Sequence, residues 1–237
     1  MAVNSLKDYI LFENDNFIVI NKPAGVAALQ DRQDRNNILA LSKDYHPEAQ
    51  LCHRLDKETT GTLAIAKNED AYRHLAIQFE KRMVNKIYHA VADGLHNFTS
   101  KRIELPLTVA GSGKVSVDKR KGKQAITIVD TLKIFRKHSL LQCQILTGRM
   151  HQIRVHLSSL GAPIAGDEQY GGKHIFLSEF KKNFNLGKYE DERPIMQRLA
   201  LHSYSLHFAG FNDEQIHVEA PYPKDFAVLL KQLNRYN

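Results

Sequence analysis

The sequence predicts an α+β fold, in one domain built on a mixed, mainly antiparallel β-sheet with flanking helices. Short runs rich in β-branched and aromatic residues, each bounded by turn residues, recur along the chain. Segments with helical apolar spacing lie among these runs, without the regular strand–helix–strand order of a parallel sheet. No internal repeat or low-complexity linker divides the 237 residues, and an apolar content of 43% suffices for a sizeable core.

Two strands and a helix are predicted in the first third of the chain. Residues 17–20 form a β-branched and aromatic run that stops at the turn residues NKPAG of 21–25. The apolar run at 62–66 predicts a buried strand. Asn68 can cap a helix that begins at Glu69, whose charge suits the positive end of the helix. The apolar stripe of this helix would consist of Ala71, Leu75, Phe79 and Met83.

The rest of the chain continues the same mixture of elements. Further strands are expected at residues 87–92, 125–134, 141–145 and 199–208. One helix is expected to end at Gly161, and another to begin at Pro223. Residues 110–123 are rich in glycine, serine, lysine and arginine, which predicts a flexible basic hairpin or loop, and residues 173–193 predict a mobile insertion.

Composition favours a soluble protein with a polyanionic partner. The formal net charge is +7, which suits nucleic acid, although a merely basic soluble protein has the same balance. Early charges interrupt the N-terminal segment and no apolar run approaches the ~20 residues that span a bilayer, so we expect neither a signal peptide nor a membrane segment. Cys52 and Cys143 form no CxxC pair and no disulfide framework, which predicts a cytoplasmic location.

The densest polar chemistry lies at residues 53–61, HRLDKETTG, directly before the predicted strand at 62–66. A carboxylate near arginine stays ionised at neutral pH, so Asp56 suits the part of a nucleophile or base better than that of a general acid. The ordinary alternative is a buried salt bridge that holds a loop. The hydroxyls and glycine of Thr59, Thr60 and Gly61 beside Asp56 favour an active site.

A second polar segment, LTGRMHQIRVH at residues 146–156, lies at a predicted strand-to-helix turn. If the fold brings Arg149 to Asp56, a bidentate pair would fix the orientation of the carboxylate. His151 and His156 are five residues apart, a poor spacing for one helical face, and no further ligand pattern accompanies them. We therefore expect no metal site.

Two further features have both an ordinary and a functional interpretation. Tyr88 is either a half-buried strand residue or an aromatic plane on which a base stacks. The loop KRKGK at 119–123 is either merely solvated or a contact for phosphates. The sequence carries no Walker loop, Rossmann glycine pattern or GxSxG elbow, which argues against nucleotide-cofactor enzymes and α/β-hydrolases.

Together these segments resemble, in order, the motifs of the RluA family of pseudouridine synthases. NKPAG at 21–25 resembles the NKPxG turn of the family, and HRLDKETTG at 53–61 resembles its catalytic HRLDxxTSG segment. KIY at 86–88 resembles its K-x-Y strand, and TGRMHQIRVH at 147–156 its TGRxHQIRxH segment. GDEQYG at 166–171 and LALHS at 199–203 resemble GDxxYG and LxLHA. Glu58 and Thr60 stand where aspartate and serine are more usual, and both keep the chemical type.

The resemblance implies a pseudouridine synthase fold with a central RNA-binding cleft. It implies one catalytic domain over residues 1–237, without the small S4-type RNA-binding domain of many relatives. The implied activity is that of an isomerase that flips a uridine out of ribosomal or transfer RNA, detaches the uracil and rejoins it through carbon 5, with no cofactor or metal. We expect a cytoplasmic monomer whose partner is RNA.

The resemblance also implies roles for individual residues. The catalytic residues would be Asp56, Tyr88 and Arg149. The residues that bind RNA or substrate would be His53, Arg54, Thr60, Arg154 and Leu201. Arg54 would fill the gap that the flipped base leaves in the RNA stack, and Tyr88 would pack on the flipped uracil.

Two other classes of protein stay open. A catalytically idle RNA-binding or ribosome-assembly protein would share the basic charge, but it has no need of Asp56, Tyr88 and Arg149 together. A glycosidase would need a second carboxylate facing the first across the substrate. Glu58 is the close candidate, and it neighbours Asp56 on a predicted turn.

Overall fold

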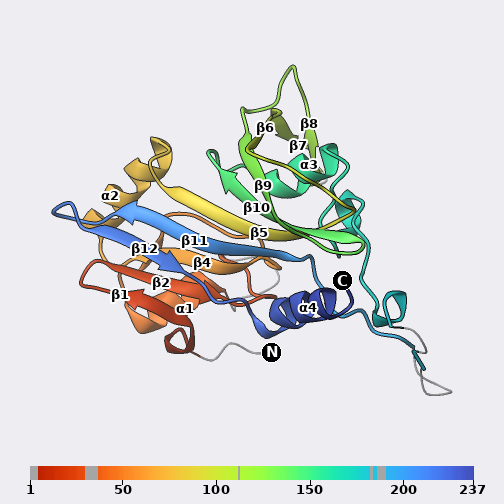
Figure 1. Ribbon diagram of the computed structural model, residues 1–237. Coiled ribbons are helices and arrows are strands. Elements are labelled where there is room, and N and C mark those ends of the chain that lie inside the picture. The colour runs from red at the N-terminus through yellow and green to blue at the C-terminus, as the bar shows by residue number, and fades with distance from the viewer. Residues whose placement is uncertain (1–4, 30–36, 112, 182–183, 186–190) are drawn as a thin grey trace. The chain divides into compact units, whose positions relative to one another are not determined.

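The computed structural model describes residues 5–29, 37–111, 113–181, 184–185 and 191–237, which form two compact units (Figure 1). Unit 1 comprises Met1–Tyr88 and His202–Pro221, and unit 2 comprises His89–Leu201 and Tyr222–Asn237. The chain passes between the units inside two strands, β5 (Asn85–Asp93) and β11 (Leu201–Ala209), and again between Pro221 and Tyr222. Tyr88 and His89 of β5 therefore belong to different units, and so do Leu201 and His202 of β11.

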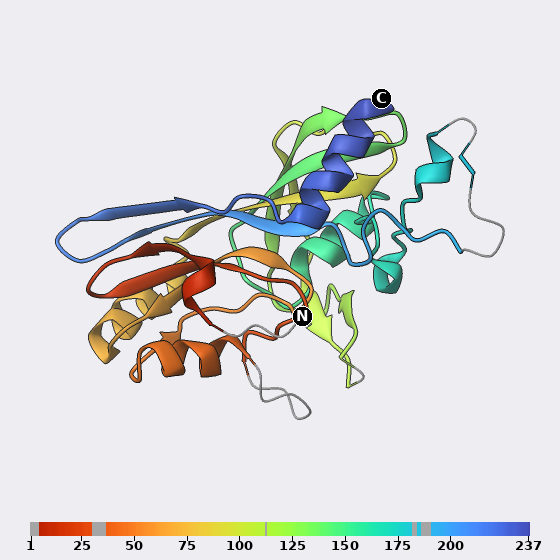
Figure 2. The same cartoon turned by 90° about the horizontal axis from the view of Figure 1, so that it is seen from below.

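Unit 1 is built on a mixed sheet. After a short 3-10 helix, η1 (Lys7–Tyr9), its strands are β1 (Ile10–Glu13), β2 (Phe17–Lys22), β3 (Gln50–Leu51), β4 (Thr60–Ala66), β11 and β12 (Gln215–Glu219). Antiparallel pairs are formed by β1 with β2, β2 with β4, β3 with β4, and β11 with β12. Strands β11 and β12 form the long hairpin in blue in Figure 2. The pairing of β4 with β11 is parallel.

Two helices complete unit 1, α1 (Ile38–Tyr45) and α2 (Glu69–Glu80). The predicted cap of α2 is confirmed, because Asn68 Oδ1 accepts a hydrogen bond from the backbone N–H of Ala71 at 2.8 Å. Ala71 and Leu75 pack in a core with apolar side chains of β2, β4, β11 and β12. The prediction that Met83 continues this stripe is wrong. The helix ends at Glu80, and Met83 is 62% exposed.

Unit 2 contains the strands β6 (Lys101–Glu104), β7 (Leu107–Val109), β8 (Val115–Val117), β9 (Ile126–Ile134) and β10 (His138–Ile145). Strand β9 pairs antiparallel with both β6 and β10, and β7 and β8 form a separate hairpin. The helices are α3 (Gln152–Ser159) and α4 (Lys224–Arg235), with the 3-10 turns η2 (Glu168–Tyr170) and η3 (Leu177–Glu179). Strand β10 covers the strand expected at 141–145, and it alternates buried and half-buried residues, with Cys143 fully buried.

The predicted α+β class with a mixed, mainly antiparallel sheet is confirmed by these elements. The expected basic segment at 110–123 contains the second strand of the β7–β8 hairpin, and the predicted helix stop at Gly161 has a left-handed φ of 72°. The insertion expected at 173–193 includes η3, and residues 182–183 and 186–190 of it lie outside the described residues. Within the part of the chain that the structure describes, no helix is long and apolar enough to cross a bilayer.

Candidate active site

Asp56 lies on a tight turn between β3 and β4 of unit 1. The backbone N–H of Thr59 donates to the carbonyl of Asp56 at 3.0 Å, and the flanking side chains of Leu55 and Thr59 are buried. Asp56 itself is partly exposed, while Arg54 is exposed. The backbone of the turn is therefore fixed by this hydrogen bond and by the buried flanking side chains, while Asp56 and Arg54 stay accessible to a substrate.

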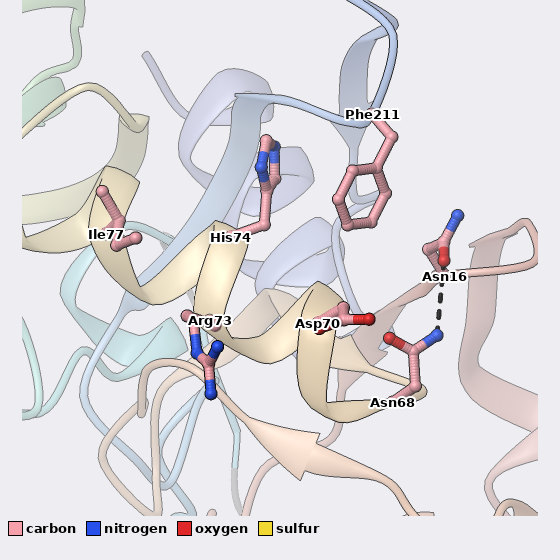
Figure 3. A pocket seen from close by; sticks show the side chains of 7 residues that line it. All are labelled: Asn16, Asn68, Asp70, Arg73, His74, Ile77 and Phe211. Carbon is pink, nitrogen blue, oxygen red and sulfur yellow. Dashed lines mark hydrogen bonds between the residues drawn. The ribbon is translucent and has the colours of Figure 1, made fainter.

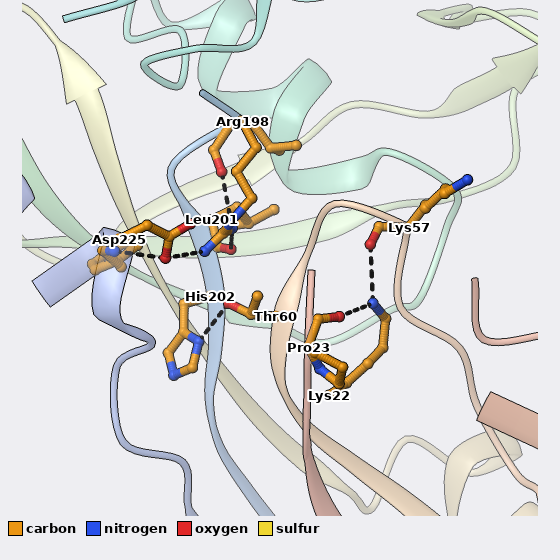
Figure 4. A network of polar contacts seen from close by, with 10 residues as sticks. Lys22, Pro23, Lys57, Thr60, Arg198, Leu201, His202 and Asp225 are labelled. Atoms are coloured by element: carbon orange, nitrogen blue, oxygen red, sulfur yellow. Dashed lines mark hydrogen bonds and ion pairs between the residues drawn. The ribbon is translucent and has the colours of Figure 1, made fainter. Parts of the chain in front are cut away.

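Lys22 fastens this turn to the NKPAG segment after β2. Its side chain is fully buried, and its Nζ donates to the carbonyls of Lys57 at 3.0 Å and Pro23 at 2.8 Å (Figure 4). The backbone N–H of Gly25 donates to the same Lys57 carbonyl at 3.0 Å. A buried ammonium group is costly without such partners. No role is predicted for Lys22 from the sequence, although it lies in the NKPAG motif at 21–25.

Gly61 lets β4 approach β11 closely. It has a φ of +110°, and a Cβ at this position would lie 2.1 Å from the backbone oxygen of Ser203. Gly61 and Ser203 are paired in the parallel register of the two strands. Only glycine fits this contact, which brings β11 against the start of β4, just after the Asp56 turn.

Tyr88 lies in β5, at the end of the first segment of unit 1, and is 6% exposed. Burial raises the pKa of Tyr88 to about 12; a hydrogen bond with the side chain of Ser203 opposes the rise, and the negative charge of Asp56 adds to it. The phenol is thus neutral at pH 7, and its ionisation responds to Asp56. The negative charge of Asp56 thus acts on the Tyr88 phenol, and both residues belong to unit 1.

His53, which is partly buried, stabilises the segment before Asp56. Its Nε2 accepts a hydrogen bond from the backbone N–H of Ala64 at 2.9 Å, and its ring stacks on Phe79 with centroids 4.7 Å apart. Burial lowers the pKa of His53 to about 3, and the positive charge of Lys86 adds to the shift. The Nζ of Lys86 lies 5.4 Å from the centroid of the Phe79 ring, the ring that also stacks on His53. Burial lowers the pKa of Lys86 to about 8.

Thr60 is held by a buried histidine of β11. His202 Nε2 donates to the carbonyl of Ala220 at 3.1 Å, because a carbonyl can only accept. His202 Nδ1 therefore accepts from the Thr60 hydroxyl at 2.8 Å (Figure 4). Thr60 is 1% exposed, so its hydroxyl supports the start of β4 in this structure.

Arg149 and Arg154 belong to unit 2. Arg149 is exposed at the turn before α3, and its Nε donates to the carbonyl of Gln124 at 3.1 Å. Arg154 is 9% exposed, and its Nε and one terminal nitrogen donate hydrogen bonds to the two carboxylate oxygens of Asp167, at 2.6 and 2.7 Å. Gln169 accepts from the same terminal nitrogen at 3.0 Å. The TGRMHQIRVH and GDEQYG segments are thus joined by this buried ion pair.

Leu201 and Arg198 occupy another part of unit 2. Leu201 is buried at the start of β11, and its carbonyl accepts from Arg198 at 3.4 Å. The Arg198 guanidinium also forms a two-bond pair with Asp225 at the start of α4, at 2.8 and 3.0 Å (Figure 4). Two sets of roles stay predictions: the catalytic roles of Asp56, Tyr88 and Arg149, and the RNA- or substrate-binding roles of His53, Arg54, Thr60, Arg154 and Leu201.

The two histidines considered as metal ligands in unit 2 contact protein groups. His156 Nε2 donates to the carbonyl of Leu105 at 3.0 Å, and its Nδ1 lies 2.9 Å from the Thr127 hydroxyl. His151 Nδ1 lies 2.8 Å from the hydroxyl of Tyr170. Among the described residues, no three histidine, cysteine, aspartate or glutamate side chains are arranged to hold a metal ion.

A separate pocket of about 430 Å³ lies at the start of α2, beyond the other end of β4 (Figure 3). It is lined by Asn16, Asn68, Asp70, Arg73, His74, Ile77 and Phe211. His74 and Phe211 pack with ring centroids 4.6 Å apart, and Asn68 donates to Asn16 at 3.3 Å. The predicted site residues lie elsewhere, so this pocket does not belong to the Asp56 site.

Comparison with known proteins finds relatives along almost the whole chain. Ribosomal large subunit pseudouridine synthase D of Neisseria meningitidis serogroup A is 36% identical, over 94% of this chain and 60% of the relative. Ribosomal large subunit pseudouridine synthase C of Vibrio parahaemolyticus is 30% identical, over 99% of this chain and 72% of the relative. The chain thus spans about 60% of the length of the Neisseria relative.

Solved structures agree with these relatives. Human RNA pseudouridylate synthase domain containing 4 has a TM-score of 0.72 and 26% identity, and the match covers 97% of this chain and 94% of that one. Human RNA pseudouridylate synthase domain containing 1 has a TM-score of 0.70 at 26% identity, with coverages of 94% and 87%. The sequence model of the RNA pseudouridylate synthase family matches residues 16–159, more than half of the chain. The resemblance inferred from the motifs is therefore confirmed, and the chain belongs to the RNA pseudouridylate synthase family.

Proposed function

We propose that this chain isomerises uridine in RNA to pseudouridine, with Asp56 as its essential carboxylate. The observation that carries the proposal is the accessible Asp56 on an anchored turn, whose charge acts on the buried phenol of Tyr88, within the residues that match the family. The reaction breaks the bond between ribose C1′ and uracil N1 and forms a bond between C1′ and C5. The proton lost from C5 is balanced by the proton gained at N1. Asp56 acts on the sugar or the base while the uracil is detached.

The test of this proposal is the Asp56→Asn variant. It keeps the size of the side chain and removes the negative charge, so it should fold and bind RNA but form no pseudouridine. Glu58→Gln is the matched control, because it removes the neighbouring carboxylate of the same turn, and it should retain activity. Pseudouridine is measured by mass spectrometry of nucleosides after digestion of the treated RNA. Substantial activity of Asp56→Asn would refute the assignment, and release of free uracil would indicate a glycosidase instead.

Arg149 is proposed as a catalytic residue that holds a carboxylate in its reactive orientation. Its guanidinium presents several donors in a fixed plane, which suits a carboxylate. The change Arg149→Lys keeps the positive charge and loses the planar fork, so it should lower the rate of pseudouridine formation while leaving RNA binding nearly unchanged. An equal loss of binding and rate would indicate an RNA contact in place of a positioning role.

The proposed substrate is large-subunit ribosomal RNA, and the proposed setting is a cytoplasmic monomer. The names of the curated relatives support the choice of RNA. The exposed basic residues of the β7–β8 hairpin and the loop after it offer a contact for phosphates. They are Lys114, Lys119, Arg120, Lys121 and Lys123. Arg54 is proposed to contact the RNA from the Asp56 turn.

Salt dependence tests the basic loop. Neutralising Lys119, Arg120 and Lys121 with glutamine removes three charges, so the slope of log affinity against log salt should fall by roughly two to three. A triple change to arginine or lysine at the same positions keeps the charge and should preserve the slope. An unchanged slope in the neutral variant would show that this loop does not contact phosphates.

A further inference from the structure

Lys86 carries a buried ammonium group for which the described part of the chain supplies no polar partner. Two lysines are buried among the described residues, Lys22 at 0% and Lys86 at 6% exposure. Lys22 Nζ donates to two backbone carbonyls. Lys86 Nζ has neither a hydrogen bond nor a carboxylate partner among the residues that the structure describes, and it lies over the face of the Phe79 ring. An unpaired buried ammonium group lowers the stability of the fold, which favours a role in binding.

The tip of the Lys86 side chain stays open to a ligand. In the described ranges, the fully enclosed side-chain polar atoms that lack a hydrogen bond belong to His46, Asp93, His138 and His174, and Lys86 Nζ is not among them. The aliphatic stem of Lys86 is therefore buried, while its nitrogen keeps access to the surface.

The ammonium group of Lys86 lies beside the segment that leads into the Asp56 turn. The Phe79 ring that it covers stacks on His53, with centroids 4.7 Å apart, and His53 is three residues before Asp56. Residues two positions apart in a strand share a face, so Lys86 and Tyr88 lie on the same face of β5, about 7 Å apart along the strand. The unpaired charge is thus next to two elements of the candidate site.

We propose that Lys86 binds a phosphate group of the RNA next to the target uridine, as a substrate-binding residue of the Asp56 site. Each phosphate of an RNA backbone carries a negative charge, and an ammonium group pairs with it as a compact point charge. Such a phosphate would supply the counter-charge that the described residues do not supply. This role rests on the proposed function, because it takes RNA as the substrate.

The charge of Lys86 changes in a pH range in which its neighbours keep theirs. Burial lowers the pKa of Lys86 to about 8. The pKa of His53 is lowered to about 3 and that of Tyr88 is raised to about 12, so both side chains stay neutral between pH 7 and 9. A bound phosphate favours the charged amine. The contribution of Lys86 to RNA affinity is therefore fully present below pH 8 and is lost as pH rises above it.

The variant Lys86→Met tests the role, because it replaces the ammonium group with an apolar side chain of similar length. It removes an unfavourable buried charge, so at pH 7 it should be at least as stable to urea as the wild type. It should nevertheless bind transcribed large-subunit ribosomal RNA about tenfold more weakly, the effect of one lost hydrogen bond between charged groups. Lys81→Met is the matched control, because Lys81 is an exposed lysine at the end of α2, and it should bind the RNA as the wild type does.

Affinity is measured by filter binding at fixed salt, at pH 7 and pH 9, with the same RNA for every protein. The wild type should bind about tenfold more tightly than Lys86→Met at pH 7, and only about twofold more tightly at pH 9, because the deprotonated amine carries no charge. The ratio between the wild type and Lys81→Met should be the same at both pH values.

Equal RNA affinity of the wild type and Lys86→Met at pH 7 would overturn the assignment of Lys86, since a role in folding alone predicts that result. A ratio of affinities that does not change with pH would also overturn it, because the lost binding would then not come from the ammonium charge. If the wild type binds RNA but forms no pseudouridine, the proposed function fails, while the two affinity ratios still decide whether Lys86 contacts a phosphate.

Discussion

The partly buried imidazole of His53 predicts a specific loss of stability in acid. In the folded protein the pKa of His53 is lowered from 6.5 to about 3, chiefly by burial. Below pH 6.5 the unfolded chain therefore binds a proton at His53 that the folded chain does not bind. The free energy of unfolding must fall as pH falls from 6.5 towards 3, and this contribution is fully present above pH 6.5.

The size of the effect follows from the two pKa values. At about pH 5 the unfolded imidazole is mostly protonated, and the linkage amounts to a loss of ~2 kcal/mol of stability relative to neutral pH. The variant His53→Gln has no titrating ring, and its amide oxygen can accept the hydrogen bond from the backbone N–H of Ala64. It should lose less stability than the wild type between pH 7.5 and 5, by this ~2 kcal/mol.

Urea unfolding at the two pH values, followed by circular dichroism, measures the difference. Carboxylates titrate in both proteins, so comparing the two changes isolates His53. A second variant, Lys86→Met, removes a positive charge that contributes to the lowered pKa, so it should reduce the acid loss by a smaller amount than His53→Gln. Equal losses in wild type and His53→Gln would refute the lowered pKa of His53.

Three further predictions concern stability and are also measured by urea unfolding. Gly61→Ala should cost several kcal/mol or abolish folding, because its Cβ would lie 2.1 Å from a carbonyl oxygen of β11, whereas Gly25→Ala, in open space with a φ of +78°, should cost only about 1–2 kcal/mol. Because the pKa of Lys86 is lowered from 10.5 to about 8, stability should rise with pH through that window, by up to ~3 kcal/mol, and Lys86→Met should abolish the rise. Arg154→Ala should cost about 3–5 kcal/mol, because it leaves the buried carboxylate of Asp167 without its main partner.

Local patterns made much of the fold predictable. The alternation of β10, the cap of α2 at Asn68 and the turn after β2 each depend on residues close together in the sequence. The wrong assignment of Met83 shows the limit of periodicity. The apolar spacing continues past Glu80, but Arg82 takes a left-handed φ of 60°, which breaks the helix and turns Met83 outward. An apolar repeat does not predict a left-handed turn at a residue that is not glycine.

The candidate site was predictable in its residue types and only partly in its contacts. Asp56 and Tyr88 stood out because their motifs concentrate polar chemistry in a few residues. The contact of Thr60 with His202 joins positions 142 residues apart, and it depends on the parallel register of β4 and β11. A one-residue slip would turn the His202 side chain to the other face of the sheet. Residues close together in the sequence therefore indicated which chemical groups the site contains. The contacts between those groups depend on strand register, which the sequence alone did not predict.

The anchoring of the Asp56 turn leads to a final prediction about catalysis. Lys22 holds the carbonyl of Lys57, one residue beyond Asp56, through its buried Nζ. Lys22→Met keeps a long apolar stem but loses both hydrogen bonds, so the turn gains freedom and Asp56 leaves its reactive position more often. We expect the rate of pseudouridine formation to fall by more than the affinity for RNA, both measured on the same RNA.

Lys57→Ala is the matched control for this change, because Lys57 is exposed and contributes only its backbone carbonyl to the contact. Alanine retains that carbonyl, so this variant should keep the wild-type rate, apart from any loss of RNA affinity caused by the missing charge. An unchanged rate in a folded Lys22→Met protein would show that Asp56 is positioned by other contacts. The predicted asymmetry distinguishes anchoring from charge, since each variant removes one lysine and only one of them removes the hydrogen bonds that hold the turn.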